Sequence, residues 1–332
     1  MATEADERAQ LPGYRDEAVV RHFEAPDAIA TRFYEVRAKS IINRVPEASR
    51  MPFRWTINPY RGCSHACVYC FARPTHTYLD FDAGRDFERE IVVKVNAPER
   101  LRAELARPSW KGEHIALGTN TDPYQWVEGR YRLLPGIWEA MIEARNPGSV
   151  LTKSPLLLRD LALMRELAVR ADFSAALSVP TLDEKAWRAT EPHTPHPRAR
   201  LEAVAELTRA GIRTGVLVAP LMPGINDDPA QVARILELAA EAGADYVTGI
   251  ALHLRGEVRG LFLDWLKARR PDLLPRYRGL YRNGAYASVR ERRRLAGMLR
   301  GPDSEPAERG RGFLRPAQPP PAAREPAQSR LF

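Results

Sequence analysis

The segment Asn58–His76 reads NPYRGCSHACVYCFARPTH and carries all three cysteines of the 332-residue chain. These are Cys63, Cys67 and Cys70, spaced as Cys-x3-Cys-x2-Cys. A disulfide framework uses an even number of dispersed cysteines, so three within eight residues indicate a metal site in a reducing compartment. A four-iron cluster is normally held by four cysteine thiolates. This chain can supply three, which would leave one iron open to an outside ligand.

Six apolar runs are predicted to be β-strands, and the cysteine segment directly follows the first. The expected strands are Phe53–Ile57, His114–Gly118, Val150–Thr152, Phe173–Val179, Thr214–Ala219 and Tyr246–Ala251. Helical patterns follow them, over Pro98–Ala106, Pro135–Ala144, Leu156–Val169, Arg198–Ala210, Pro229–Ala242 and Leu261–Arg269. Six strand-then-helix units predict a parallel sheet, either open and doubly wound or curved into a partial barrel.

Parallel βα folds carry their chemistry in the loops that follow the strands. After the first strand, these loops are polar and marked by glycine or proline. They read GTNTDPYQ at 118–125, TKSP at 152–155, SVPTLDE at 178–184, EPHTPHP at 191–197 and PLMPGINDD at 220–228. Together with the cysteine segment they form the predicted site.

The cysteine loop, with Tyr69 before its last cysteine, resembles that of the radical S-adenosylmethionine (SAM) superfamily. The run NPYRGCSHACVYCFAR, followed by GTNTDPYQ and TKSP, is similar to the branch that contains spore photoproduct lyase. The resemblance extends over about Trp55–Trp265, the whole predicted barrel. The expected fold is therefore α/β: a partial (βα)6 TIM-type barrel of parallel strands with disordered termini.

The resemblance implies two cofactors, a [4Fe–4S] cluster on the three cysteines and SAM on the open iron. Reductive cleavage of SAM would give methionine and a 5′-deoxyadenosyl radical that abstracts hydrogen from the substrate. The residues implied in SAM binding come from four loops, and a cation among them would pair with the SAM carboxylate or ribose region. They are Tyr69 near the adenine; Gly118, Thr119, Asn120 and Thr121 near the amino group; and Lys153, Ser154 and Ser178 at further polar positions.

Several of these residues have simpler interpretations. The three cysteines with His65 or His76 would also suit a structural Cys₃His zinc site. The segment Asn120–Asp122 before proline is also typical of an Asx-turn, and Lys153 of a salt bridge. Glu191 and Arg198 are further candidates for contacts with substrate or SAM.

The sequence departs from spore photoproduct lyase in one respect that concerns the end of the reaction. That enzyme uses a further cysteine, outside the cluster triad, to return hydrogen to the substrate radical. This chain has no fourth cysteine. A tyrosine is the alternative hydrogen donor, and Tyr124 in the second loop is the candidate catalytic residue.

The C-terminal end is basic, with thirteen arginines against six acidic residues from Pro271 to Phe332. A basic end attracts polyanions, although it is also typical of a solvated tail. The run Arg292–Arg294 would contact phosphates of DNA. The last five residues, Gln328–Phe332, resemble the short Gln-x-x-Leu-Phe peptides that dock in the bacterial sliding clamp.

Four regions are expected along the chain. They are an N-terminal extension over 1–50 with a helical piece near Ala28–Val36, the barrel over 51–270, a basic helical region over 271–300 and a disordered Pro/Arg-rich tail over 301–332. There is no apolar run of about 18 residues and no secretory signal, so a cytoplasmic protein without a membrane span is expected.

Three functional hypotheses follow. The first is a radical SAM enzyme, served by a flavodoxin- or ferredoxin-type reductant, that acts on DNA in a lyase or repair reaction. The second is a radical SAM maturase or metabolic enzyme with a peptide or small-molecule substrate. The third is a zinc-bound nucleic-acid adaptor without catalysis.

Overall fold

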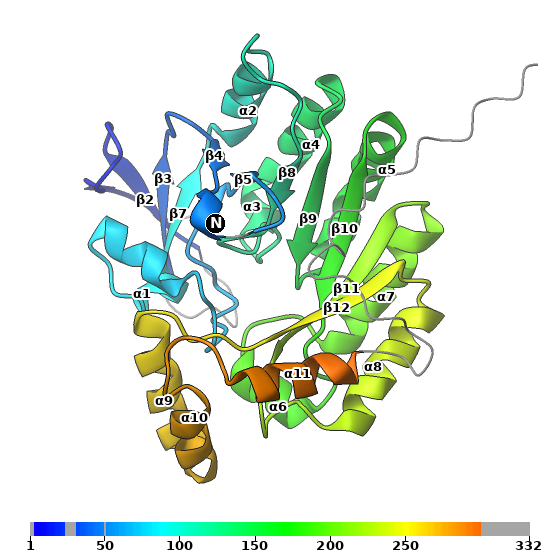
Figure 1. Ribbon diagram of the computed structural model, residues 1–332. Helices are drawn as coiled ribbons and strands as arrows, with labels where there is room; N and C mark the ends of the chain where they lie inside the picture. The colour runs from blue at the N-terminus through cyan, green and yellow to red at the C-terminus, as the bar shows by residue number, and fades with distance from the viewer. Residues whose placement is uncertain (1–2, 24–30, 50, 300–332) are drawn as a thin grey trace, which may run out of the picture.

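The computed structural model describes residues 3–23, 31–49 and 51–299, and its centre is a curved seven-stranded sheet (Figure 1). The strands lie in the order β12-β11-β10-β9-β8-β5-β4. From β5 to β12 neighbouring strands are parallel, whereas β4 is antiparallel to β5. Their bounds are β4 (Ile42–Arg44), β5 (Trp55–Ile57), β8 (Ile115–Leu117), β9 (Gly148–Thr152), β10 (Phe173–Ser178), β11 (Arg213–Leu221) and β12 (Tyr246–Ala251).

The six predicted strands are thus confirmed, and they lie across the sheet in chain order. Within the described residues β4 and β12 stay at opposite ends of the sheet. The fold is therefore the expected partial barrel of parallel strands rather than a closed one.

The predicted helices are also confirmed, and several of them pack on a neighbouring helix. In α4 the side chains of Leu134, Ile137, Trp138 and Met141 are fully buried, a spacing that puts them on one face. The stretch predicted as one helix over Leu156–Val169 is divided, because Ser154 caps a separate 3-10 turn, η3 (Pro155–Asp160). The helices are α2 (Ala97–Leu105), α4 (Leu133–Glu143), α5 (Leu161–Arg170), α7 (Pro197–Arg209), α8 (Pro229–Glu241) and α9 (Glu257–Arg269).

Shorter elements fill the loops and the C-terminal region. From residue 271 to residue 299 the chain is largely helical. The short elements are η1 (Glu47–Ser49), η2 (Arg73–Leu79), α1 (Asp86–Arg89), α3 (Glu128–Tyr131), α6 (Glu184–Thr190), η4 (Pro271–Leu273), α10 (Leu274–Leu280) and α11 (Val289–Met298).

A second, five-stranded sheet lies beside the first, in the order β1-β2-β3-β7-β6. Its strands are β1 (Thr3–Ala9), β2 (Ala18–His22), β3 (Arg32–Val36), β6 (Tyr60–Arg61) and β7 (Glu90–Lys94). The helical piece expected near Ala28–Val36 is wrong where the structure describes it. Arg32–Val36 is a strand because it pairs in parallel with β7, and the guanidinium of Arg32 contacts the carboxylate of Glu90 at 2.8 Å.

This second sheet matters for the site because it holds both sides of the cysteine segment. Strand β6 ends two residues before Cys63, and β7 begins at Glu90, after the cysteine segment. The two strands are paired antiparallel, Tyr60 with Val93 and Arg61 with Val92. The cysteines therefore lie in a connection closed at its base by hydrogen-bonded strands.

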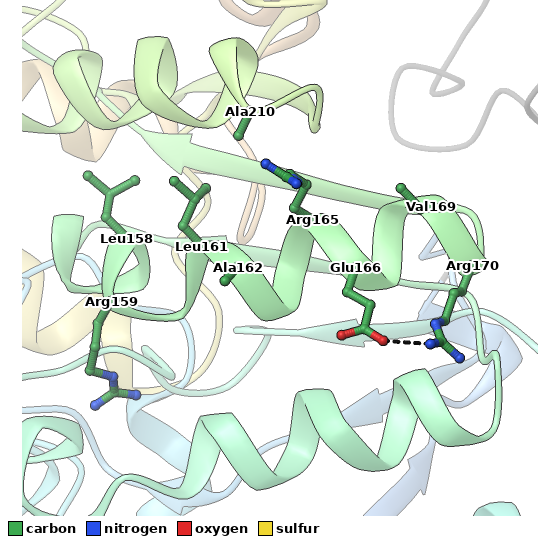
Figure 2. Close-up of a pocket in the computed structure, with 9 residues that line it drawn as sticks. All are labelled: Leu158, Arg159, Leu161, Ala162, Arg165, Glu166, Val169, Arg170 and Ala210. Atoms are coloured by element: carbon green, nitrogen blue, oxygen red, sulfur yellow. Dashed lines mark ion pairs between the residues drawn. The ribbon is translucent and has the colours of Figure 1, made fainter.

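The outer surface carries an open groove along η3 and α5 (Figure 2). Its floor includes Leu158 and Leu161, and an ion pair of 2.8 Å between Glu166 and Arg170 lies at one end. None of the residues predicted for the site lines this groove.

One part of the sequence prediction falls outside this description. The expected disordered tail over 301–332, including Gln328–Phe332, lies outside the described residues. Among the residues that are described, no helix is both long and apolar enough to cross a membrane.

Candidate functional site

The cysteine loop begins at a glycine that brings it close to the segment before β7. Gly62 has φ +82°, and a Cβ there would lie 2.8 Å from the carbonyl oxygen of Phe87. The next residue, Cys63, donates its backbone N–H to that same oxygen at 2.9 Å. Glycine is thus required at this position by both the backbone conformation and the close approach.

A buried arginine holds the middle of the loop. Arg73 donates Nε to the carbonyl of Cys67 at 3.1 Å and Nη2 to the carbonyl of Ala66 at 3.2 Å. Its third group, Nη1, donates to the carbonyl of Gly84 at 2.5 Å. The loop therefore wraps around a guanidinium that its own sequence supplies three residues after the last cysteine.

The loop after β8 fastens the other side of the cysteine loop. The Thr121 hydroxyl donates to the carbonyl of Gly62 at 2.6 Å. The side chain of Gln125, which is fully buried, accepts the backbone N–H of Ser64 at 2.9 Å. Two loops that are about 60 residues apart in sequence are thus joined, as the parallel-sheet rule predicts.

Between these loops lies a cavity of about 210 Å³ at the ends of the parallel strands. All three cysteines line it, together with eight residues predicted or suspected from the sequence: Tyr69, Gly118, Thr119, Asn120, Thr121, Asp122, Lys153 and Ser178. Further lining residues come from the later strands: Leu217, Ala219, Pro220, Ile250, Leu252 and His253. The structure therefore brings most of the predicted site to one place.

The three thiols fit the role of cluster ligands. They are free and face one cavity, and burial raises the pKa of each, that of Cys67 to about 12. Without a cation the thiols are thus held neutral, because burial removes the water that would solvate a thiolate. A metal cluster supplies the positive charge that makes three buried thiolates stable. The donor set therefore suits iron–sulfur ligation.

A buried ion network forms one wall of the cavity. Lys153 Nζ lies 3.0 Å from Glu191 Oε1 and donates to the Ser178 hydroxyl at 2.6 Å. The other oxygen of Glu191 contacts Arg200 Nη2 at 2.7 Å, and the Tyr69 hydroxyl donates to Glu191 Oε1. Burial alone would raise the pKa of Glu191, but Arg200 and Lys153 lower it to about 2. Glu191 is therefore ionised and fixes Lys153 and Tyr69 in place.

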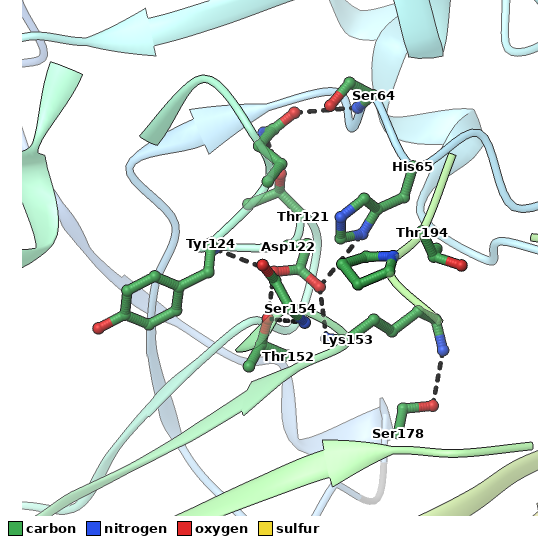
Figure 3. A network of polar contacts seen from close by, with 12 residues as sticks. Ser64, His65, Thr121, Asp122, Tyr124, Thr152, Lys153, Ser154, Ser178 and Thr194 are labelled. Atoms are coloured by element: carbon green, nitrogen blue, oxygen red, sulfur yellow. Dashed lines mark hydrogen bonds and ion pairs between the residues drawn. The ribbon is translucent and has the colours of Figure 1, made fainter. Parts of the chain in front are cut away.

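A second buried carboxylate, Asp122, organises the neighbouring loop (Figure 3). It accepts the backbone N–H groups of Tyr124 at 2.9 Å and Lys153 at 2.8 Å, and the Thr152 hydroxyl at 2.5 Å. His65 Nδ1 lies 3.3 Å from it. Burial opposes ionisation, yet His65 and these donors lower the pKa of Asp122. The contact of Asp122 with the Tyr124 N–H, two residues later, is the Asx-turn that the sequence suggested. Through Thr152 and Lys153 the same carboxylate also joins the loop after β8 to the end of β9.

The glycine of this loop is constrained as well. Gly118 has φ +84°, and a Cβ there would lie 1.9 Å from the carbonyl of Leu151 on the neighbouring strand. Thr119 exchanges hydrogen bonds with the side chain of Asn58, whose oxygen also accepts the backbone N–H of Asn120 at 3.1 Å. The segment predicted to meet SAM is therefore positioned mainly by its backbone, and the Asn120 side chain is exposed.

Three predicted residues do not face the cavity. Ser154 caps η3, with its hydroxyl accepting the Leu156 N–H at 3.2 Å. Tyr124 points away from Lys153 and Ser178 (Figure 3) and its hydroxyl is held between Asp160 Oδ2 at 2.9 Å and Trp138 Nε1 at 2.8 Å. Arg198 is exposed at the start of α7. These placements argue against a hydrogen-donor role for Tyr124 and against cofactor contacts by Ser154 and Arg198.

Of the two histidines considered for the alternative zinc site, only His76 is engaged elsewhere. His76 does not line the cavity; its Nε2 lies 2.8 Å from the carbonyl of Glu90 and its ring contacts Phe87 edge-on. His65 lines the cavity but points Nδ1 at Asp122. His76 is therefore not placed to be a zinc ligand, whereas the contact of His65 with Asp122 is one that zinc-bound histidines also make.

Some residues that contribute to the site carry little signal in the sequence. Arg200, which is fully buried, was overlooked in favour of Arg198, two residues earlier on the same helix. Asn58 and His65 lie within the quoted cysteine segment but were given no role in binding SAM. Phe71 and His253 at the cavity edge carried no signal in one sequence, since exposed aromatic residues are common on protein surfaces.

Comparisons with known proteins agree with this geometry. The family model described as Radical SAM superfamily matches residues 57–236. An uncharacterized protein of Mycobacterium tuberculosis is 47% identical over 327 residues, which cover 97% of this chain and 94% of that protein. The Radical SAM Nalpha-GlyT isomerase of Pseudomonas phage M6 is 27% identical over 193 residues, 57% of this chain and 37% of that protein.

Among solved structures, the chain is similar to spore photoproduct lyase. A mutant of that enzyme with bound AdoMet and dinucleoside spore photoproduct matches with a TM-score of 0.58 at 17% identity, over 80% of this chain and 76% of that chain. At this identity the match establishes a shared fold.

Proposed function

The chain belongs to the radical SAM superfamily, and from this premise we propose that it holds a [4Fe–4S] cluster on Cys63, Cys67 and Cys70 and cleaves SAM to act on a base in DNA. The observation that carries the proposal is the set of three free thiols at one cavity, opposite the loop that follows β8. Membership of this family already makes the protein a radical SAM enzyme.

Cys63, Cys67 and Cys70 would hold the cluster, which would supply the electron for reductive cleavage of SAM and so for hydrogen abstraction from the substrate. The chain's own residues position SAM and exclude water. Tyr69, held through its hydroxyl by Glu191, offers a ring face to the cavity, with Lys153 Nζ 5.8 Å from the ring centre. Lys153 retains a donor for the carboxylate or ribose of SAM after its contacts with Glu191 and Ser178.

Apolar residues from the later strands complete the enclosure. One side of the cavity is lined by apolar residues in β11 and directly after β12: Leu217, Ala219 and Leu252. In the strand order of the sheet, these strands lie on the far side of β9 and β10 from β8, which precedes Thr119 and Asn120. Such a lining limits the access of water to a radical and so protects it from side reactions. Substrate would enter past Ile250 and Phe71, which line the cavity and are both half exposed.

Two features support DNA as the substrate. Exposed arginines, including Arg292 and Arg293, lie on α11 beside the edge strand β12 (Figure 1). The fold neighbour named above was solved with a dinucleoside photoproduct. A base in a duplex would have to be flipped out to reach an enclosed cavity, and this step favours damaged or unpaired bases.

The chain differs from that neighbour's expected chemistry at the final step. All three of its cysteines are assigned to the cluster, so no thiol is left to return hydrogen to the substrate radical. We therefore propose that the closing hydrogen comes from 5′-deoxyadenosine, with SAM regenerated, or from a group other than a cysteine.

The partners belong to the same proposal. A cytoplasmic location with a flavodoxin- or ferredoxin-type reductant suits an oxygen-sensitive cluster with free thiols. The C-terminal Gln328–Phe332 would dock in the bacterial sliding clamp, Leu331 and Phe332 filling an apolar pocket. Titration of a peptide of residues 318–332 against the clamp tests this, and no binding at tens of micromolar would exclude it.

The test of the proposed function is anaerobic reconstitution with iron and sulfide, followed by reaction with SAM and dithionite. We expect 5′-deoxyadenosine to form, and DNA carrying ultraviolet lesions to change its yield or to be altered. Formation of 5′-deoxyadenosine that no DNA affects would favour the peptide or small-molecule hypothesis. No formation under any condition would contradict SAM cleavage itself.

A further inference from the structure

A row of three aromatic rings leads outward from the cysteine cavity. Phe71 follows the last cysteine and lines the cavity, with its side chain 50% exposed. Its ring centre lies 5.9 Å from that of His253, which in turn lies 6.0 Å from that of Tyr286. Tyr286 is 47% exposed. The row therefore begins beside Cys70 at the cavity and ends at Tyr286, and both of its end residues are about half exposed.

The row is built from three segments that are distant in sequence. Phe71 belongs to the cysteine loop, His253 follows β12, and Tyr286 precedes α11. A β-bridge joins His253 to Tyr286, and the N–H of the adjacent Leu254 donates to the carbonyl of Ala285 at 2.7 Å. Backbone hydrogen bonds therefore fix the segments that carry the His253 and Tyr286 rings.

Two arginines flank the outer ring. The guanidinium carbon of Arg255 lies 5.2 Å from the centre of the Tyr286 ring, and that of Arg292 lies 5.8 Å from it. Both side chains are exposed. A second hollow, of about 250 Å³, lies under this corner and shares Ile250 and His253 with the cysteine cavity. The surface at the cavity mouth is therefore aromatic, positively charged and concave.

We infer that Phe71, His253 and Tyr286, with Arg255 and Arg292, form a platform that stacks the bases of single-stranded or flipped-out DNA at the cavity mouth. The inference rests on the proposed function and names how its substrate is held. Proteins bind single-stranded nucleic acid with exposed aromatic rings, on which the bases stack, and with nearby arginines, which contact the phosphates. Burial and the neighbouring Arg255 lower the pKa of His253, which favours its neutral form.

The arrangement also explains why exposed aromatic residues gather here. Phe71 and Tyr286 each leave about half of their side chain in water, so both are accessible to a ligand and their burial by it would favour binding. Ile250, at the junction of the two hollows, is 50% exposed as well. A stacked base would cover these faces while Arg255 and Arg292 meet the backbone phosphates that flank it.

The test is binding of a fluorescein-labelled oligothymidylate to the full chain, followed by fluorescence anisotropy at several salt concentrations. Tyr286→Leu keeps an apolar side chain but removes the ring, and we expect binding about ten-fold weaker or more. Tyr286→Phe keeps the ring and should bind nearly as the wild type does. Arg292→Gln should reduce the slope of log K against log salt by about 0.7.

Controls separate stacking from general effects. Tyr78→Leu changes another tyrosine, 76% exposed, that lines neither hollow, and should not weaken binding. Thermal unfolding of each variant establishes that it is folded. Equal weakening by Tyr286→Leu and Tyr78→Leu, or no weakening by Tyr286→Leu, would overturn the platform.

The proposed function and the platform fail in different ways. Formation of 5′-deoxyadenosine without DNA measures SAM cleavage alone. If the wild type cleaves SAM but does not bind the oligonucleotide even at low salt, the platform is excluded and the radical chemistry stands. If it binds the oligonucleotide through the ring but never cleaves SAM, the platform stands and the proposed function is excluded.

Discussion

Glu191 Oε1 lies 3.0 Å from Lys153 Nζ, so a carboxylate with no solvent exposure holds the cation at the wall of the cysteine cavity. The same carboxylate contacts Arg200 and accepts a hydrogen bond from Tyr69. Two cations and one tyrosine are thus oriented by one buried anion. Glu191 does not line the cavity itself, and it positions two residues that do.

We predict that Glu191→Gln destabilises the protein strongly. Removal of one partner from a buried ion network leaves Arg200 and Lys153 without a counter-charge and costs about 3–5 kcal/mol. Thermal or urea unfolding measures the change. As a control, Glu184→Gln removes an exposed partner of Arg188 and should cost less than about 1 kcal/mol. A similar small cost for both variants would contradict the network.

Gly118→Ala should disrupt the junction of β8 and β9. Its Cβ would meet the Leu151 carbonyl at 1.9 Å, and φ of +84° is unfavourable for alanine, so we expect a loss of at least about 2 kcal/mol. Gly260→Ala, in α9, meets no atom within 4 Å and should stabilise by up to about 1 kcal/mol. If both variants unfold at the wild-type temperature, the constraint at Gly118 is absent.

The buried side chain of Lys94 should make the stability of the protein depend on pH. Burial lowers the pKa of Lys94 from 10.5 to about 7, and Nζ has one hydrogen bond, to the carbonyl of Asn58 at 2.8 Å. Between these pH values the unfolded chain binds more protons at this residue than the folded chain. Its contribution to stability therefore rises with pH, by up to about 1.4 kcal/mol per unit.

The comparison of wild type with Lys94→Met isolates that contribution. The free energy of unfolding of the variant should exceed that of the wild type by the largest amount near pH 7. This difference should shrink toward pH 10. Urea unfolding at pH 7, 8 and 9 measures it. Lys185→Met, which changes an exposed lysine, should show no such trend. A difference that does not vary with pH would show that Lys94 titrates normally.

Tyr124→Phe tests whether the second-loop tyrosine takes part in the reaction. Its hydroxyl is buried between Asp160 and Trp138, so its removal should cost about 1–3 kcal/mol of stability. Formation of 5′-deoxyadenosine and of product should continue at the wild-type rate below the unfolding temperature. A folded variant that forms 5′-deoxyadenosine but no product would return Tyr124 to the hydrogen-donor role.

The sequence was sufficient for the barrel because each predicted strand is short, apolar and followed by a helical pattern. It was not sufficient for the second sheet. Strand β3 pairs with β7, whose residues follow 58 positions later in the chain, and polar residues such as Arg32 and Glu35 interrupt the apolar pattern. Pairing at that separation leaves no local trace, so Arg32–Val36 resembled part of a helix.

The site could be predicted where the chemistry requires a fixed spacing of residues along the chain. It could not be predicted where packing in the folded protein decides which of two similar residues is buried. The cysteine loop and Gly118 belong to the first class. Arg198 and Arg200 belong to the second, because residues two apart on a helix point in nearly opposite directions. One faces water and the other faces Glu191. Which of them is buried depends on contacts that the sequence of α7 does not specify.

The measurement that tests the central claim most directly is the metal and sulfide content of oxygen-free protein, with its absorption near 400 nm, for wild type and for Cys67→Ser. We predict iron and sulfide in the proportion of a [4Fe–4S] cluster in the wild type, with 5′-deoxyadenosine formed from SAM on reduction, and loss of both in the variant. A wild type that contains one zinc ion and no sulfide would contradict the assignment.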